Sequence, residues 1–223
     1  MIKKALLTLF IAIITIPLFS QKNSGVVLYK VVSKKEVNFK KIIKKGNLTS
    51  FFKGKAAFEL VFKEDKSLYK RKVKFNKEGE REKINFFEIV GGSDGVFYNE
   101  KDKTIQSVNK YDEDFLVTYL PNQWQITQEN KIIGGYVCYK AISKNNRVVW
   151  FTPNIPLSLG PKHLNGLPGL ILEVEIGKIS IVASEIVFKE ISDKRIKKPT
   201  KGVPITEKEY SKKIKEIAKS IGF

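Results

Sequence analysis

The stretch NGLPGLILEVEIGKISIVASEIVF, residues 165–188, decides the predicted fold of this 223-residue chain. It opens with a loop rich in glycine and continues as two runs in which apolar and polar side chains alternate, which is typical of β-strands. Four aliphatic residues of the first run point to one face of the predicted strand: Leu170, Leu172, Val174 and Ile176. The runs are joined at Gly177-Lys178, so the stretch predicts a β-hairpin that enters the core from a shaped loop.

The loop that opens this stretch predicts a specific turn. It consists of Gly166, Leu167, Pro168, Gly169, Leu170 and Ile171. A proline at the second turn position holds φ near about −65°, and a glycine at the third tolerates a positive φ, which together favour a type II turn. We therefore expect a positive φ at Gly169, where a β-branched residue would strain the backbone.

The same alternation of apolar and polar residues recurs along most of the chain. Clear examples are AAFELVFK (56–63), SLYKRKVKF (67–75) and INFFEIV (84–90). Turn signals separate the runs, among them Glu100–Lys103 and Lys144-Asn145-Asn146. The pattern predicts a succession of strands joined by tight hairpins.

The number of predicted strands bounds the architecture. About nine or ten strands with short turns favour antiparallel pairing, and a sheet of this size must curl, close on itself or split into layers. We therefore expect a mainly β fold: a single curled antiparallel sheet, or a half-barrel or two-layer β domain, with a C-terminal amphipathic helix. The concave face of a curled sheet commonly holds apolar ligands, which makes that face a candidate binding site.

The first residues, MIKKALLTLFIAIITIPLFSQ, have the organisation of a secretory signal peptide. Two lysines precede an apolar run over 5–16, and Ser20 is a small residue suited to the position before the cleaved bond. The run is shorter than the roughly 20 residues that cross a bilayer. We expect a signal peptide at 1–20, cleavage near Ser20-Gln21, and an exported protein of the periplasm or outer membrane; the alternative is an uncleaved N-terminal anchor.

The C-terminal part of the chain differs from the predicted antiparallel β domain at 21–194. Residues 195–223 are predicted to be a basic linker, broken by proline and glycine, followed by a helix. Thr206 and Glu209 have the spacing of a capping box. An apolar stripe follows at helical spacing: Tyr210, Ile214, Ile217 and Ile221. We expect the stripe to pack on the sheet; the alternative is a helix that lies on a membrane surface.

The chain carries a formal net charge of +18, from 41 basic and 23 acidic residues. A strongly basic exported protein is attracted to anionic partners such as lipid head groups, so an anionic envelope surface is a candidate partner. Nucleic acid is the other usual partner of such a charge, and the predicted export argues against it. A lysine-rich bias spread over solvated faces explains the charge equally well.

Few residues of the chain are suited to catalysis. Cys138 and His163 are the only residues of their types, so they are the one possible cysteine–histidine pair; a buried structural thiol is the alternative.

GGSDG (91–95) has the spacing of a nucleophile elbow but precedes a predicted strand instead of the required helix. Asp112-Glu113-Asp114 is an acidic cluster that fits a solvated turn or a weak calcium site. We expect no catalytic residue, metal or cofactor.

Three runs in the second half of the chain resemble a known protein family. YVCYKA (136–141), VVWFTPNIPLSLGP (148–161) and NGLPGLILEV (165–174) are similar to the GLPGLI family, which is named for its hexapeptide. The resemblance implies an exported protein of a Gram-negative cell envelope with no established biochemical activity. It defines no catalytic or ligand-binding residue.

Aromatic residues and the single histidine supply the candidate ligand-binding positions. We select Trp124, Trp150, Phe151 and His163 as residues that could line an apolar pocket, with core packing as the alternative. The first functional hypothesis is a non-enzymatic binding or carrier module for an apolar or lipid-like ligand. The second is a structural or accessory protein that binds an outer-membrane partner through sheet edges or basic loops. A hydrolase ranks last, because no paired catalytic groups are evident.

Overall fold

The computed structural model describes residues 23–33, 55–72, 85–101 and 103–220. The predicted signal peptide at 1–20, the end of the run at 67–75 and Ile221 lie outside these residues. Within them, no helix combines the length and the apolar character that crossing a membrane requires.

Twelve strands form one sheet in the described residues, so the predicted mainly β fold is confirmed. The strands are β1 Ser24–Ser33, β2 Ala56–Lys63, β3 Lys66–Arg71, β4 Gly95–Glu100, β5 Lys103–Lys110, β6 Glu113–Tyr119, β7 Trp124–Ile133, β8 Tyr136–Ser143, β9 Val148–Thr152, β10 Leu170–Ile176, β11 Ile179–Phe188 and β12 Val203–Thr206. They are accompanied by the helices α2 Phe86–Gly91 and α3 Glu207–Ser220 and the 3-10 turn η1 Asp193–Arg195.

The strand order is β12-β6-β5-β4-β3-β2-β1-β11-β10-β9-β8-β7. Neighbouring strands are antiparallel, with the exception of β12, which runs parallel to β6. The predicted hairpins at Glu100–Lys103, Lys144-Asn145-Asn146 and Gly177-Lys178 are confirmed as β4–β5, β8–β9 and β10–β11.

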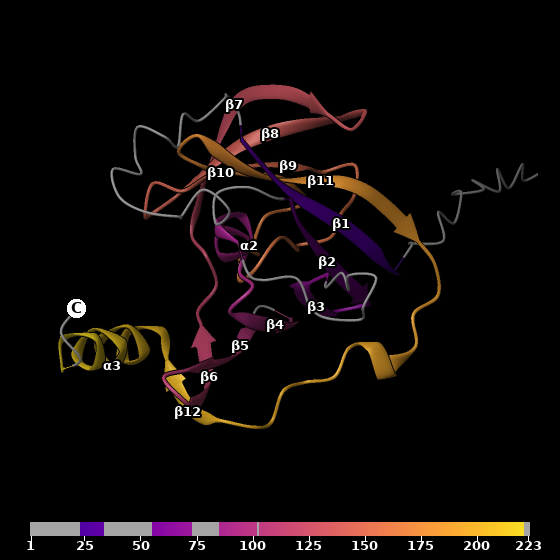
Figure 1. Cartoon of the computed structure of the whole chain (residues 1–223). Coiled ribbons are helices and arrows are strands. Elements are labelled where there is room, and N and C mark those ends of the chain that lie inside the picture. Colours follow the sequence, from indigo (N-terminus) through magenta and orange to yellow (C-terminus); the bar gives the residue numbers. More distant parts are fainter. Residues whose placement is uncertain (1–22, 34–54, 73–84, 102, 221–223) are drawn as a thin grey trace, which may run out of the picture.

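The connection between β6 and β7 requires the sheet to curl. These strands lie ten positions apart in the sheet, which in a flat sheet is roughly 48 Å at about 4.8 Å for each strand. The four connecting residues, Leu120–Gln123, reach at most about 17 Å. The sheet therefore curls into an open curve that does not close on itself; Figure 1 shows β7 at one end of the curve and β12 at the other.

The chain itself fills the concave face of the sheet. Helix α2 lies inside the curve (Figure 1) and packs on β1 and β2. The loop at 153–169 buries four side chains on the same face, those of Ile155, Leu159, Leu164 and Leu167, and they join the side chains of the sheet in one core. In the described part of the chain, this face is thus a packed core and not the open apolar surface that a curled sheet led us to expect.

Of the strand predicted at 84–90, residue 84 lies outside the described residues, and 85–90 do not form a strand, because a capping box starts helix α2 there. The Asn85 side chain accepts from the backbone N–H of Glu88 (3.1 Å), and the Glu88 carboxylate accepts from the backbone N–H of Asn85 (3.0 Å). Glu88 is buried and also pairs with Arg71 of β3 at 2.5 Å. Local capping and this ion pair outweigh the strand propensity of a short apolar run.

The type II turn predicted at Leu167–Leu170 is wrong. The glycine with a positive φ is Gly166, at +89°, and Gly169 does not adopt that conformation. Gly169 is needed for a different reason, because a Cβ at that position would lie 2.1 Å from the carbonyl oxygen of Thr152. The motif thus uses one glycine to turn the loop and another to let the loop approach β9 closely.

The C-terminal segment contains a strand that the sequence did not predict. Residues 203–206, at the end of the basic segment, form β12 and pair with β6. The predicted capping box at the start of α3 is confirmed, since Glu209 accepts from the backbone N–H of Thr206 at 3.0 Å and donates its own N–H to the Thr206 hydroxyl at 3.3 Å. Tyr210 then packs edge-on against Phe115 of β6, with ring centroids 5.3 Å apart. The apolar stripe of α3 therefore faces the sheet, as expected.

The acidic cluster at 112–114 helps to hold this C-terminal segment. Asp114 pairs with Lys201 at 2.6 Å, and Glu113 pairs with Lys213 of α3. Across the described ranges, no group of three or more histidines, cysteines and carboxylates is arranged to bind a metal. Two acids of the cluster, Glu113 and Asp114, thus form surface ion pairs, each of small energetic value.

Candidate functional site

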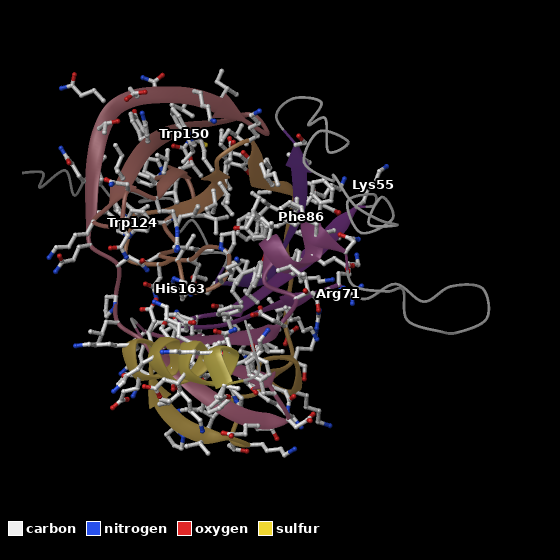
Figure 2. All side chains as sticks on the ribbon, turned by 60° about the vertical axis from the view of Figure 1, so that its left-hand side comes forward. Lys55, Arg71, Phe86, Trp124, Trp150 and His163 are labelled. Atoms are coloured by element: carbon white, nitrogen blue, oxygen red, sulfur yellow. The ribbon has the colours of Figure 1, made fainter. Side chains whose placement is uncertain are left out.

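The four residues that we selected as ligand-binding candidates lie at separate places. Figure 2 shows Trp150, Trp124 and His163 well apart on the ribbon. The register pairs Trp150 with Glu173 and Lys140, so it shares the convex face of the sheet with them. There its indole N–H donates to Glu175 at 2.7 Å, and the ammonium group of Lys131 lies over its ring.

The other three candidates lie on the concave side. Phe151 is a buried core residue. Trp124 donates its indole N–H to the backbone carbonyl of Asn165 at 2.7 Å, and the Asn122 amide donates to the carbonyl of His163 at 2.8 Å. Trp124 and Asn122 thus fasten the loop at 153–169, and of the four candidates His163 alone lines a groove described below.

His163 is held as a neutral ring. It stacks on Tyr119, with centroids 4.2 Å apart and an angle of 6° between the planes. Its Nε2 atom lies 3.2 Å from Nη1 of Arg147. A guanidinium group can only donate, so Nε2 accepts and the proton is on Nδ1. Burial, followed by the charges of Arg147 and Lys162, lowers the pKa of His163 to about 3.

Lys162 is the second cation beside this histidine. Its backbone has a positive φ of 59°, and its aliphatic stem lies against Gly92, where an added Cβ would be 3.0 Å from Cε of the lysine. Burial lowers the pKa of Lys162 to about 8; Asp94 opposes this shift and Arg147 adds to it. Of the residues with described positions, none offers a carboxylate within 4 Å of the charged group of Lys162 or Arg147.

These polar groups lie in a groove of about 390 Å³ on the concave rim of the sheet. The groove is bounded by the β8–β9 and β10–β11 hairpins, α2 and the loop at 153–169. Its lining residues are Val90, Asn145, Arg147, Lys162, His163, Leu164, Val174, Glu175, Ile176 and Ile181. Five of them are aliphatic, so the groove combines an apolar wall with two cations. Its one acid, Glu175, already accepts from Trp150 and lies 3.7 Å from Lys131.

A larger groove of about 670 Å³ lies on the convex side, between β4–β6 and the segment before β12. Its basic residues are Lys101, Lys103 and Lys198, and they surround Glu100. Glu100 pairs with Lys198 at 3.6 Å and with Lys66 at 3.7 Å. The charges of this groove are therefore exposed and partly neutralised within the protein, which makes it a weaker candidate than the concave groove.

The structure does not bring Cys138 and His163 together. Cys138 is paired with Lys131 and shares the convex face with Trp150, while His163 belongs to the loop that covers the concave face. Burial raises the pKa of the Cys138 thiol to about 11. A buried thiol with a raised pKa that lies on the opposite face from the only histidine of the chain is poorly suited to act as a nucleophile.

Sequence reasoning missed Arg147 and Lys162. Both are single basic residues in turns of a chain with 41 lysines and arginines, so no spacing sets them apart. Their distinguishing property is that both are half-buried beside each other, which follows from the packing of two loops that are separate in the sequence.

Comparison with known proteins gives a coarse result. A family model described as "Protein of unknown function (Porph_ging)" matches residues 143–173, which include Arg147, Lys162 and His163. This match covers less than half of the chain and is consistent with the resemblance to the GLPGLI family. A search of curated proteins finds no match.

Two solved structures of PNGF-II, in the C2 and P21 space groups, are similar in fold. Their TM-scores are 0.53 and 0.52 at 16% sequence identity, and the alignments cover 85% of this chain and 32% of PNGF-II. The chain thus spans about a third of the length of PNGF-II. At this identity the likeness concerns the fold alone.

Proposed function

We propose that this chain is an exported, non-enzymatic binding module of the cell envelope that holds a lipid-like ligand in the concave groove. The observation that carries the proposal is a groove in which aliphatic side chains lie next to two half-buried cations without carboxylate partners in the described residues. A volume of about 390 Å³ falls within the range of small-molecule sites. The ligand is held at the rim, because the loop at 153–169 occupies the rest of the concave face.

The proposed location rests on the N-terminal sequence. A basic start, an apolar run and a small residue before Gln21 favour export to the periplasm or the outer membrane. Cleavage near Ser20-Gln21 removes Lys3 and Lys4 from the +18 of the full chain, so the exported protein keeps a charge of +16. A protein with this charge is attracted to anionic envelope surfaces, and after export it does not meet nucleic acid.

A binding role is favoured over hydrolysis by the state of the two residues that catalysis would need. His163 accepts from Arg147 and has a pKa near 3, so its ring stays neutral and is a weak base. Cys138 is buried on the opposite face of the sheet. No proton-transfer pair is assembled from these two groups.

Native mass spectrometry of the protein purified from its own envelope tests this proposal. We expect an additional mass in the range of a lipid, and we expect Ile176→Asn, which places a polar group on the groove wall, to reduce it. Ile132→Asn is the matched control, because Ile132 is an exposed isoleucine on β7, outside the groove. A protein without bound small molecules, or one in which both variants behave alike, would contradict the proposal.

A structural or accessory role is the second candidate, and the free edge of β7 favours it. Among the described residues this strand ends the sheet and pairs with β8 alone, and Ile126 and Ile132 on it are 50% and 74% exposed. Such an edge can accept a strand from a partner. In the same measurement, a stoichiometric outer-membrane protein in place of a lipid would favour this second function.

A further inference from the structure

We infer that the ligand of the concave groove is an amphiphile with an oxyanion head group, which binds between Arg147 and Lys162 while its apolar part lies along the aliphatic wall. This inference rests on the proposed function and deepens it by naming the ligand class. The head group is a carboxylate or a phosphate, which offer the same acceptor chemistry.

The charges around the groove call for an anion. Arg147 and Lys162 place two positive charges beside a neutral histidine. One acid acts on them: Asp94 influences Lys162 without reaching salt-bridge distance. The Glu175 carboxylate lies on the convex face, where it accepts from Trp150 and lies 3.7 Å from Lys131. Cations that are partly removed from water without a paired acid are costly, and a bound anion removes that cost.

The donors of the groove are suited to oxygen acceptors. The Arg147 side chain donates one N–H to His163, which fixes its orientation. The other guanidinium N–H groups have no acceptor among the side chains and carbonyls that the structure describes, and the fork they form matches a carboxylate or phosphate. His163 adds a buried Nδ1 without a partner in the described chain. The site thus supplies unused donors where the two cations meet.

The apolar wall selects an amphiphile over a small free anion. Val90, Val174, Ile176 and Ile181 line the groove next to the cations. Val174 and Ile181 are opposed in the β10–β11 hairpin and are buried in the core, whereas Ile176 is 39% exposed and Val90 is half-buried. A hydrocarbon chain laid on Ile176 and Val90 gains burial energy that acetate or free phosphate cannot gain.

Calorimetric titration with matched ten-carbon probes tests the inference. Decanoate, decyl phosphate and decanol are titrated below their aggregation concentrations at pH 7, with acetate and inorganic phosphate as head groups alone. We expect the better of the two anionic amphiphiles to bind at least about tenfold more tightly than decanol, as expected for a charge-assisted contact. Which of the two binds more tightly identifies the head group. We expect acetate and phosphate to bind more weakly than either amphiphile.

Variants locate the head group. Lys162→Gln and Arg147→Gln should each reduce the preference for the anion over decanol, and Lys103→Gln, on the convex groove, should leave it unchanged. Thermal melting confirms that each variant is folded. If Arg147→Gln does not fold, the preference measured with Lys162→Gln alone decides the test.

The outcomes distinguish a failure of this inference from a failure of the proposed function on which it rests. Equal binding of decanol and both anions overturns the inference and leaves the binding module intact. The inference is also overturned if the preference for an anion over decanol remains in both Lys162→Gln and Arg147→Gln. It is likewise overturned if free phosphate binds as tightly as decyl phosphate. Binding of none of the probes contradicts the proposed function itself.

Discussion

Replacing Lys162 with methionine is expected to stabilise the folded protein in the absence of a ligand. Methionine keeps the apolar stem that lies against Gly92 and removes the buried charge. The fall in the pKa of Lys162 from 10.5 to about 8 measures the cost of that charge, which at about 1.36 kcal/mol for each tenfold change is roughly 3 kcal/mol. Because the side chain retains some exposure, we expect a gain of about 1 to 3 kcal/mol.

The pH dependence of this gain has a defined sign. Between about pH 8 and pH 10.5 the unfolded chain keeps a proton at Lys162 that the folded chain has lost, so the contribution of this residue to stability rises with pH. Below about pH 8 the lysine is charged in both states and the cost is fully present. The advantage of Lys162→Met should therefore be constant below about pH 8 and should vanish towards pH 10.5.

Urea unfolding of the wild type and the variant at pH 7 and pH 10 measures the effect, in buffers free of phosphate and carboxylate ions that would occupy the groove. The matched control is Lys103→Met, because Lys103 is an exposed lysine of the convex groove and its replacement should change stability by less than about 0.5 kcal/mol. A Lys162→Met protein that is no more stable than the wild type at pH 7 would show that the charge of Lys162 carries no burial cost. So would an advantage that is the same at both pH values.

Four further outcomes follow from the structure. Gly169→Ala should destabilise the protein by at least about 2 kcal/mol in urea unfolding, because its Cβ would meet a β9 carbonyl at 2.1 Å; unchanged stability would show that the close approach is absent. Glu88→Gln should cost about 3 kcal/mol by breaking the buried pair with Arg71, and a loss below about 1 kcal/mol would argue against burial of that pair. Cys138 should resist iodoacetamide at pH 8 in the native protein and react after unfolding, since burial raises its pKa to about 11; rapid native labelling would contradict this. Decanoate affinity should fall as the pH rises through about 8, where Lys162 loses its charge, and an affinity that is flat from pH 7 to pH 9 would remove Lys162 from the head-group site.

Local patterns were sufficient for most of the elements. Strands and tight hairpins follow from alternation and turn residues, and α3 follows from its capping box and apolar stripe, because each of these signals lies within a few neighbouring residues. Helix α2 was missed although Asn85 and Glu88 have capping-box spacing, since a short apolar run is compatible with either a helix or a strand. Strand β12 was missed because its four residues are stabilised by pairing with β6, which is remote in the sequence.

The mainly β character of the chain, the hairpins and the C-terminal helix follow from the amino-acid order, since they depend on side-chain periodicity and local backbone preferences. What occupies the concave face, and which charges meet there, depends on how distant segments pack together. The loop at 153–169 fills that face, and its packing brings Lys162 and His163 to Arg147 of the β8–β9 hairpin. Whether a basic residue is solvated or buried without a partner depends on neighbours from other parts of the chain, so no local pattern could have distinguished these two cations from the others.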